Sequence, residues 1–235
     1  MFTIPPPSTD RRTAARAVDP RDLLIQHKRL ISVAQIVRHT SPELADEIEA
    51  IGGDFLQTST GLALRDPATG IQNARALEDR LPAEVSRARR TSALPLSCLM
   101  VDGNNFRDLN FRYGHVDTNK IISELCLLME HELRPSDLLV RFGGDECAAL
   151  LGGTTADEAL PLAIRLCNVI ANHPFLGGKA RVSVTIGVAT LLLSDRDGKA
   201  MLARADIALY YAKAHMKGAA HAWTSDLGWP DGYYG

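Results

Sequence analysis

Two acidic residues in a glycine-rich stretch carry the clearest chemical signal of this sequence. Asp145 and Glu146 directly follow Gly143 and Gly144, and a short apolar run flanks them on each side. Glycine supplies the positive φ that a tight turn requires, so the pattern predicts a β-hairpin with both acids at its tip. Exposed carboxylates are hard, acceptor-only ligands that suit Mg²⁺. A purely structural turn is the alternative, because Gly and Asp are ordinary turn residues.

A third acid and two lysines extend this signal. Asp102 ends the apolar run 94–101, which is typical of a buried strand. Carboxylates that meet from two strand ends can clamp a metal for phosphoryl or nucleotidyl transfer. Lys213 and Lys217 are four residues apart in a helix expected over 199–217, so both ammonium groups would leave one face and could hold a polyphosphate. The alternative is a solvated lysine pair near a helix C-terminus, where the dipole favours cations.

The apolar pattern indicates the elements that must position these side chains. Residues 182–188 are rich in β-branched side chains, which are typical of a strand. Helical spacing is found over 22–37, from Pro42 behind an N-cap at Ser41, over 74–90, after Gly114, and around 162–170. Strands and helices alternate around the expected hairpin. We therefore expect an α/β (α+β) fold in which helices flank a central sheet.

Composition excludes several other classes of protein. A hydrophobic fraction of 46% and a charged fraction of 23% are typical of a soluble globular chain. The formal net charge of -2 gives no indication of nucleic-acid or membrane binding. Four separated cysteines (Cys98, Cys126, Cys147 and Cys167) without a C-x-x-C pair predict buried free thiols in a reducing cytoplasm rather than a zinc site. No apolar run of transmembrane length or secretory h-region is present, so we expect a cytoplasmic protein.

The 235 residues divide into four predicted segments. Residues 1–20 are rich in proline and polar side chains and predict a disordered leader. Residues 21–60 form a helical N-terminal segment that is too small to be a confident domain and would serve dimerisation or regulation. Residues 62–223 hold the expected hairpin, the expected strands and the remaining helices. Residues 224–235 form an aromatic C-terminal tail that packs on the domain or contacts a partner.

Five motifs in order resemble a known family. They are Asp66-Pro67-Ala68-Thr69-Gly70-Ile71-Gln72-Asn73, Asp102-Gly103-Asn104-Asn105-Phe106-Arg107-Asp108-Leu109-Asn110, Tyr113-Gly114-His115, Gly143-Gly144-Asp145-Glu146-Cys147 and Ala205-Asp206-Ile207-Ala208-Leu209-Tyr210-Tyr211-Ala212-Lys213. Each alone is weak, but their order and spacing over residues 62–223 resemble the GGDEF domain of bacterial diguanylate cyclases. The resemblance implies a nucleotidyl-cyclase-like, mostly antiparallel sheet flanked by helices.

The resemblance also implies a reaction. Two GTP molecules, one on each protomer of a homodimer, would be joined into cyclic di-GMP with release of two pyrophosphates. Each 3′-hydroxyl would attack the α-phosphate of the other nucleotide, so the two half-sites must face each other. Asp102, Asp145 and the Gly103 carbonyl would hold Mg²⁺ (or Mn²⁺). Asp145 and Glu146 would be the catalytic acids nearest the attacking hydroxyl.

The remaining family positions would bind the substrate or the product. Substrate-binding residues by this carry-over are Phe106, Arg107, Asn110, His115, Asn119, Gly143, Gly144, Lys213 and Lys217. The basic members would neutralise the triphosphate, the asparagines would read guanine, and the glycines would let phosphate approach the backbone. His115 also fits a purely structural role beside Gly114. Arg134 and Asp137 match the family's R-x-x-D inhibitory site for cyclic di-GMP, where arginine stacks on guanine and a carboxylate accepts its N–H groups.

Three departures from the family pattern bear on activity. Asn119 stands where an aspartate usually accepts from guanine, so base selection is expected to relax towards ATP as well as GTP. Thr118 replaces a glycine, and Cys147 replaces the signature phenylalanine. The alternative to a cyclase is therefore an inactive GGDEF module that acts as a receptor for GTP or cyclic di-GMP in signalling. A third hypothesis is a structural module whose N-terminal helices dimerise.

Overall fold

The computed structural model describes residues 20–90 and 94–227, except that the side chains of residues 20–24 and 54–63 are not described. The chain divides into two compact units, the first ending at Leu64 and the second beginning at Arg65. The predicted leader lies outside the described residues apart from Pro20, and so do residues 228–235 of the predicted tail. In the described part of the chain, no helix has the length and apolar composition needed to cross a lipid bilayer.

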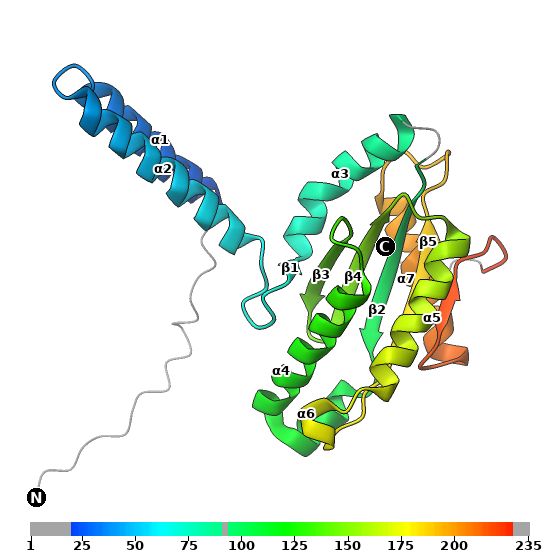
Figure 1. Cartoon of the computed structure of the whole chain (residues 1–235). Coiled ribbons are helices and arrows are strands. Elements are labelled where there is room, and N and C mark those ends of the chain that lie inside the picture. Colours follow the sequence, from blue (N-terminus) through cyan, green and yellow to red (C-terminus); the bar gives the residue numbers. More distant parts are fainter. Residues whose placement is uncertain (1–19, 91–93, 228–235) are drawn as a thin grey trace, which may run out of the picture. The chain divides into compact units, whose positions relative to one another are not determined.

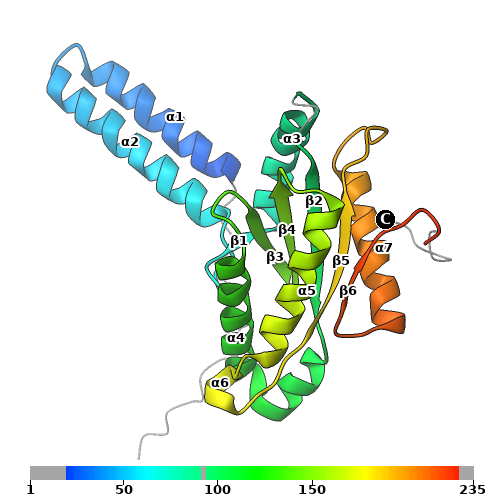
Figure 2. The same cartoon turned by 45° about the vertical axis from the view of Figure 1, so that its right-hand side comes forward.

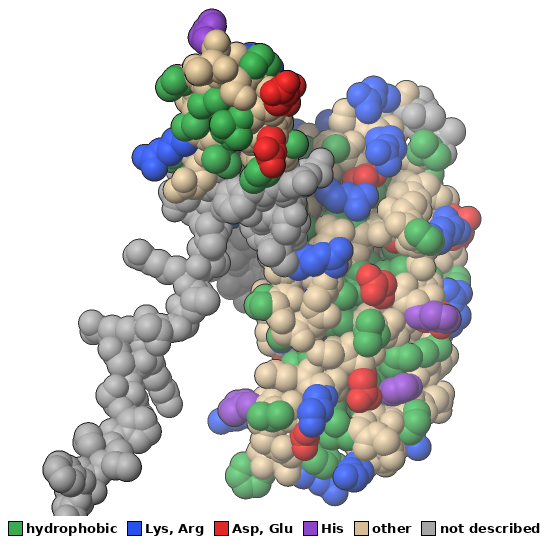
Figure 3. All heavy atoms as spheres, turned by 60° about the vertical axis from the view of Figure 1, so that its left-hand side comes forward, with side chains coloured by type: hydrophobic (Ala, Val, Ile, Leu, Met, Phe, Trp, Pro, Cys, Tyr) green, Lys and Arg blue, Asp and Glu red, His purple; other side chains and the backbone are tan. Residues whose placement is uncertain are grey.

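The first unit is a helical hairpin of α1 (Pro20–Val37) and α2 (Pro42–Ala63). Arg38, in the turn between the helices, contacts Asp46 and Glu49 of α2, each at 2.8 Å. Apolar side chains lie at the surface of this unit, where several are about half exposed or more (Figure 3). They are Ile25, Val33, Ile36, Leu44 and Ile51. The described residues of this unit leave this apolar stripe uncovered.

The second unit is built on a six-stranded sheet with the order β1-β3-β4-β2-β5-β6. Its strands are β1 (Gln72–Asn73), β2 (Leu96–Gly103), β3 (Leu138–Gly143), β4 (Glu146–Gly152), β5 (Val184–Thr190) and β6 (Ala220–Ala222). The three central pairings are antiparallel, whereas the short outer strands β1 and β6 pair in parallel. This arrangement confirms the predicted sheet, which is mostly antiparallel and flanked by helices.

Helices cover both faces of the sheet (Figures 1 and 2). They are α3 (Ala74–Arg90), α4 (Phe106–Glu132), α5 (Ala156–Asn172), the short α6 (Phe175–Gly178) and α7 (Lys199–His215). Helices α4 and α5 enclose the main core with one face, where Leu99 and Val101 of β2 are buried. Cys98, which directly precedes Leu99, points the other way and contacts the backbone of α7. This alternation is the period of two of a β-strand, and the run 94–101 could be apolar throughout because both of its faces are covered.

One glycine sets the contact between α7 and the sheet. Gly187 lies in β5, and a Cβ atom at this position would stand 2.0 Å from the carbonyl oxygen of Ala205 and 2.3 Å from the amide nitrogen of Leu209. Both atoms belong to the backbone of α7, so they cannot move aside as a side chain could. Helix α7 therefore rests directly on the backbone of β5.

Several boundaries differ from the sequence prediction. Helix α7 ends at His215 rather than Lys217, because Met216 leaves helical geometry (φ -149) and Gly218 follows at φ +93. Helix α4 starts at Phe106, ahead of the predicted start after Gly114, and Gly114 interrupts it with φ +78. Strands β1 and β6 were not predicted. The four cysteines are free and buried, as predicted.

Candidate active site

The predicted hairpin consists of β3 and β4 joined by Gly144 and Asp145. Gly143 faces Glu146 across its end, next to an irregularity in the pairing. Gly143 and Gly144 have φ values of +149 and +57, which glycine adopts without strain, and a Cβ at either would meet no atom within 4 Å. The glycines are thus required by the bend of the turn and leave open space above it. Asp145 is partly buried and Glu146 is exposed, at the tip.

Asp102 lies beside this tip because β2 and β4 are neighbours. In the antiparallel register Asp102 is opposite Glu146, and the Gly103 amide donates to the carbonyl oxygen of Asp145 at 3.0 Å. The structure therefore places the end of β2 at Asp102 beside the turn that carries Asp145 and the start of β4 at Glu146. A side chain at Gly103 would clash, since its Cβ would stand 2.3 Å from the Phe106 ring and 2.9 Å from the Asp145 Cβ.

A single lysine balances part of the negative charge. Lys213 of α7 places its Nζ 2.7 Å from Oδ2 of Asp102. Burial, and then the charge of Asp102, raise the pKa of Asp145, against the opposing effects of Lys213 and Arg141. Two carboxylates that repel each other at an open strand end are a donor set suited to a divalent cation.

The residues fit a magnesium or manganese ion. Asp102, Asp145 and the Gly103 carbonyl supply hard oxygen ligands, and Mg²⁺ commonly takes one or two carboxylates together with substrate phosphates and water. Among the residues that the structure describes, no three His, Cys, Asp or Glu side chains are grouped to hold a metal. The ion would thus depend on the nucleotide for its remaining ligands.

A cavity of about 210 Å³ adjoins the hairpin. Four predicted substrate-binding residues of α4 line it, namely Phe106, Asn110, His115 and Asn119, and they share it with Gly144 and Asp145 of the turn. Arg107 does not line it and is exposed on the first turn of α4. Thr118 also lines the cavity, and its hydroxyl donates to the Gly114 carbonyl at 2.9 Å, so the threonine is accommodated at the helix kink.

The two lysines do not share a helix face, so that prediction was wrong. Lys213 lies in the last turn of α7 and contacts Asp102, whereas Lys217 lies beyond the end of α7. The Nζ of Lys217 donates to Oδ1 of Asn105 at 2.8 Å instead. The early end of the helix removes the spacing of four on which the prediction depended.

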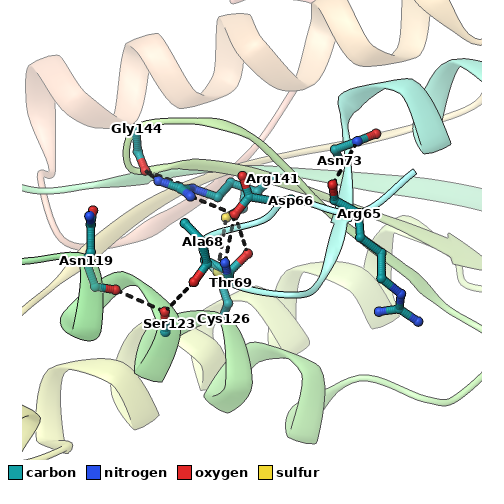
Figure 4. Close-up of polar contacts among 11 residues, drawn as sticks. Arg65, Asp66, Ala68, Thr69, Asn73, Asn119, Ser123, Cys126, Arg141 and Gly144 are labelled. Atoms are coloured by element: carbon teal, nitrogen blue, oxygen red, sulfur yellow. Dashed lines mark hydrogen bonds and ion pairs between the residues drawn. The ribbon is translucent and has the colours of Figure 1, made fainter. Parts of the chain in front are cut away.

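Sequence analysis missed the residue that holds the turn. Arg141 of β3 is buried, its Nη1 lies 2.7 Å from Oδ1 of Asp66, and its Nε and Nη2 donate to the Gly144 carbonyl at 3.1 and 2.7 Å (Figure 4). Although burial opposes ionisation, hydrogen bonds from Thr69 and Arg141 lower the pKa of Asp66. A charged residue inside an apolar strand run signals a buried partner, and this signal could have revealed the pair.

The loop that contains Asp66 also contacts the helix of the cavity (Figure 4). Ser123 Oγ lies 3.1 Å from the Ala68 carbonyl oxygen and 3.0 Å from that of Asn119. Thr69 donates to Oδ1 of Asp66 through both its amide and its hydroxyl, at 2.9 and 2.7 Å. Loop 66–70 therefore connects the hairpin turn, through Arg141, with α4.

The predicted inhibitory pair lies at a separate cavity of about 350 Å³. The Arg134 amide donates to Oδ2 of Asp137 at 3.0 Å, and the Asp137 amide donates back to the Arg134 carbonyl at 2.9 Å. Oδ1 of Asp137 is buried without a hydrogen-bond partner among the described residues, and burial raises the pKa of this carboxyl. Arg65, Arg80 and Glu130 add charge to the lining. The cavity shares no residue with the one beside the hairpin.

Known proteins match this chain in sequence. The family model "Diguanylate cyclase, GGDEF domain" covers residues 63–219. Diguanylate cyclase DgcP of Pseudomonas aeruginosa is 35% identical over 152 residues, which are 64% of this chain and 22% of that protein. The chain spans about a fifth to a half of the length of the curated relatives it matches.

Solved structures agree with the family match. The active GGEEF domain of a Vibrio cholerae diguanylate cyclase superposes with a TM-score of 0.62 at 29% identity, over 65% of this chain and 97% of that one. Diguanylate cyclase SiaD of P. aeruginosa, in complex with its activator SiaC, superposes with a TM-score of 0.66 at 26% identity, over 86% of this chain and 77% of that one.

Proposed function

The chain belongs to the GGDEF family of diguanylate cyclases, and from this premise we propose that it condenses two GTP molecules into cyclic di-GMP with release of two pyrophosphates. The observation that carries the proposal is the convergence of Asp102, Asp145 and Glu146 with Lys213 at one strand end. That set can hold a metal, bind phosphate and accept a proton. A purely structural turn would not require these charged side chains beside one another.

Each group has a step in this mechanism. Bound Mg²⁺ (or Mn²⁺) would neutralise the α-phosphate and acidify the attacking 3′-hydroxyl. Lys213 exchanges its contact with Asp102 for the triphosphate, and the open backbone at Gly143 and Gly144 admits the phosphates. Glu146, exposed at the tip, accepts the hydroxyl proton. The 3′-oxygen forms a bond to the α-phosphorus of the other nucleotide. At the same time the bond between that phosphorus and the oxygen bridging to the β-phosphate breaks, and pyrophosphate leaves.

The reaction needs a second copy of the chain, because one hairpin and one cavity serve one nucleotide. Two half-sites must meet across a two-fold axis for each hydroxyl to reach the opposite α-phosphate. The apolar stripe on α1 and α2 provides a dimerisation surface, with Ile36 at 74% and Ile51 at 57% exposure. Dimerisation through α1 and α2 makes the helical hairpin the element through which a regulator acts on the catalytic domain.

Base selection is expected to be relaxed. Asn119 lines the cavity with one acceptor oxygen and one NH₂ group, whereas guanine presents two donors from N1 and the exocyclic amine. The loss of one acceptor weakens discrimination against adenine. Restoring the acid with Asn119→Asp should narrow the products of a GTP and ATP mixture to cyclic di-GMP. An unchanged product ratio would remove Asn119 as the cause.

Product inhibition is proposed at Arg134 and Asp137. The unpartnered Oδ1 of Asp137 lies where it could accept from a guanine edge, and the exposed Arg134 could stack on the base. The exposed Arg112, over the Tyr113 ring at 5.3 Å, provides a matched arginine elsewhere. Arg134→Ala should raise the late product yield while Arg112→Ala leaves it unchanged. Coincident progress curves for all three proteins would contradict the site.

The deciding experiment combines purified protein and Mg²⁺ with GTP, ATP or both, and resolves the products by mass. We expect cyclic di-GMP from GTP, a mixed dinucleotide when both are present, and no product from Asp145→Asn. Asp117→Asn is a matched control, since Asp117 pairs with Lys120 on the surface of α4. If the protein binds GTP but forms no product, the proposed cyclase function would be rejected in favour of a nucleotide receptor.

A further inference from the structure

Two buried thiols face each other directly behind the catalytic hairpin. Cys126 lies in α4 and Cys147 in β4, with Sγ atoms 4.0 Å apart and exposures of 0% and 1%. Either thiol can be the donor of this contact. The other two cysteines, Cys98 and Cys167, contact the backbone carbonyls of Met201 and Val184 instead.

We propose that Cys126 and Cys147 form a reversible disulfide that switches the neighbouring site off under oxidising conditions. The sulfurs of a disulfide are about 2.0 Å apart, so the two must approach each other by about 2 Å. No atom needs to leave the space between them, since they are already in contact. The effect on turnover rests on the proposed function, whereas formation of the bond does not.

The chemistry balances with a small two-electron oxidant such as hydrogen peroxide. One of the two thiols attacks one peroxide oxygen, the O–O bond breaks, and a sulfenic acid and water form. The other thiol then displaces water from that sulfur, which gives the disulfide and a second water molecule.

The bond would act on both halves of the site. Cys147 follows Glu146 in β4 and faces Arg141 in the register with β3. Cys126 lies two helical turns after Asn119 of the cavity. Drawing these elements together shifts the hairpin acids against the base cavity, and a misplacement of about 1 Å can cost about 100-fold in rate. We therefore expect turnover to fall at least about 10-fold on oxidation.

The test treats the full chain with hydrogen peroxide and measures both the bond and the activity. Non-reducing peptide mass spectrometry should find one crosslink, between Cys126 and Cys147, with loss of the two thiol hydrogens. GTP turnover should fall in parallel and return with a dithiol. Cys126→Ala should lose the response and Cys167→Ala should keep it. If Cys126→Ala does not fold, Cys147→Val, which keeps a small apolar side chain, should likewise lose the response to peroxide.

Two results would overturn the proposal. One is the absence of the crosslink at peroxide doses that oxidise the exposed Met216, and the other is a complete crosslink with unchanged turnover. A protein that shows no turnover even when reduced would contradict the proposed function instead. In that case GTP affinity is measured in place of turnover, before and after oxidation. A crosslink that leaves this affinity unchanged would contradict the proposal that the disulfide controls the site.

Discussion

Replacing Arg141 should destabilise the domain and slow catalysis together. The guanidinium is 8% exposed and makes three contacts, one with Asp66 and two with the Gly144 carbonyl. Arg141→Ala leaves the Asp66 carboxylate, which is 18% exposed, without its cation. Removal of one partner from a buried ion pair costs about 3–5 kcal/mol. Because Asp66 keeps its bonds from Thr69 and some contact with solvent, we expect the lower end of that range.

This cost can be read in thermal unfolding and in the rate. About 3 kcal/mol corresponds to a fall of about 6–12 °C in the unfolding midpoint of a domain with 150–250 residues. The Gly144 carbonyl would also lose its two donors, so the Asp145 turn would sample other positions. A displacement of about 1 Å lowers kcat by about 100-fold. Arg141→Lys should give an intermediate result, since one ammonium cannot serve Asp66 and the carbonyl at once.

Arg165 provides the matched control. Its Nε lies 2.8 Å from Glu132, but the arginine is 55% exposed, and such surface pairs contribute about 0–1 kcal/mol. Arg165→Ala should therefore leave both midpoint and rate close to wild type. A double-mutant cycle with Asp66→Asn isolates the pair energy. If Arg141→Ala unfolds no more easily than Arg165→Ala and keeps its kcat, the assignment of Arg141 as the residue that holds the turn is refuted.

Three further predictions follow from single contacts. Lys213→Met should weaken GTP binding about 10–100-fold, as expected for the loss of one charged hydrogen bond, while Lys120→Met leaves calorimetric affinity unchanged. Chelation of divalent metal should abolish turnover but move the unfolding midpoint little, because Lys213 already balances Asp102 without the ion. Burial opposes ionisation of Asp195, but hydrogen bonds from Arg204 outweigh it and lower its pKa. The contribution of ionised Asp195 to the free energy of unfolding is thus present above about pH 4 and is lost as the pH falls through the lowered pKa. Asp195→Asn should therefore flatten the acid side of a plot of unfolding free energy against pH.

Local pattern was sufficient to predict the hairpin and most helices. Two glycines between apolar runs specify the bend, and spacings of three and four specify the stripe of α4. The edge strands β1 and β6 could not be predicted in this way. They have two and three residues, and they exist only because β3 and β5 lie beside them.

The parts of the site that sequence reasoning missed depend on distant pairs. Arg141 and Asp66 are 75 positions apart, so no local spacing connects them. The lysine prediction was wrong for the opposite reason, since it extended a local period through Met216, where the helix had already ended. Contacts between elements, rather than patterns within one element, decide which charges meet.

The contact at Gly187 has a consequence for how this domain tolerates mutation. Because the backbone of α7 rests on the backbone of β5 there, no side chain can be added at position 187 without displacing α7. Lys213 lies on α7, so such a displacement would move its Nζ away from Asp102. A substitution at Gly187 would therefore disturb the candidate site from a strand that contributes no acid to it.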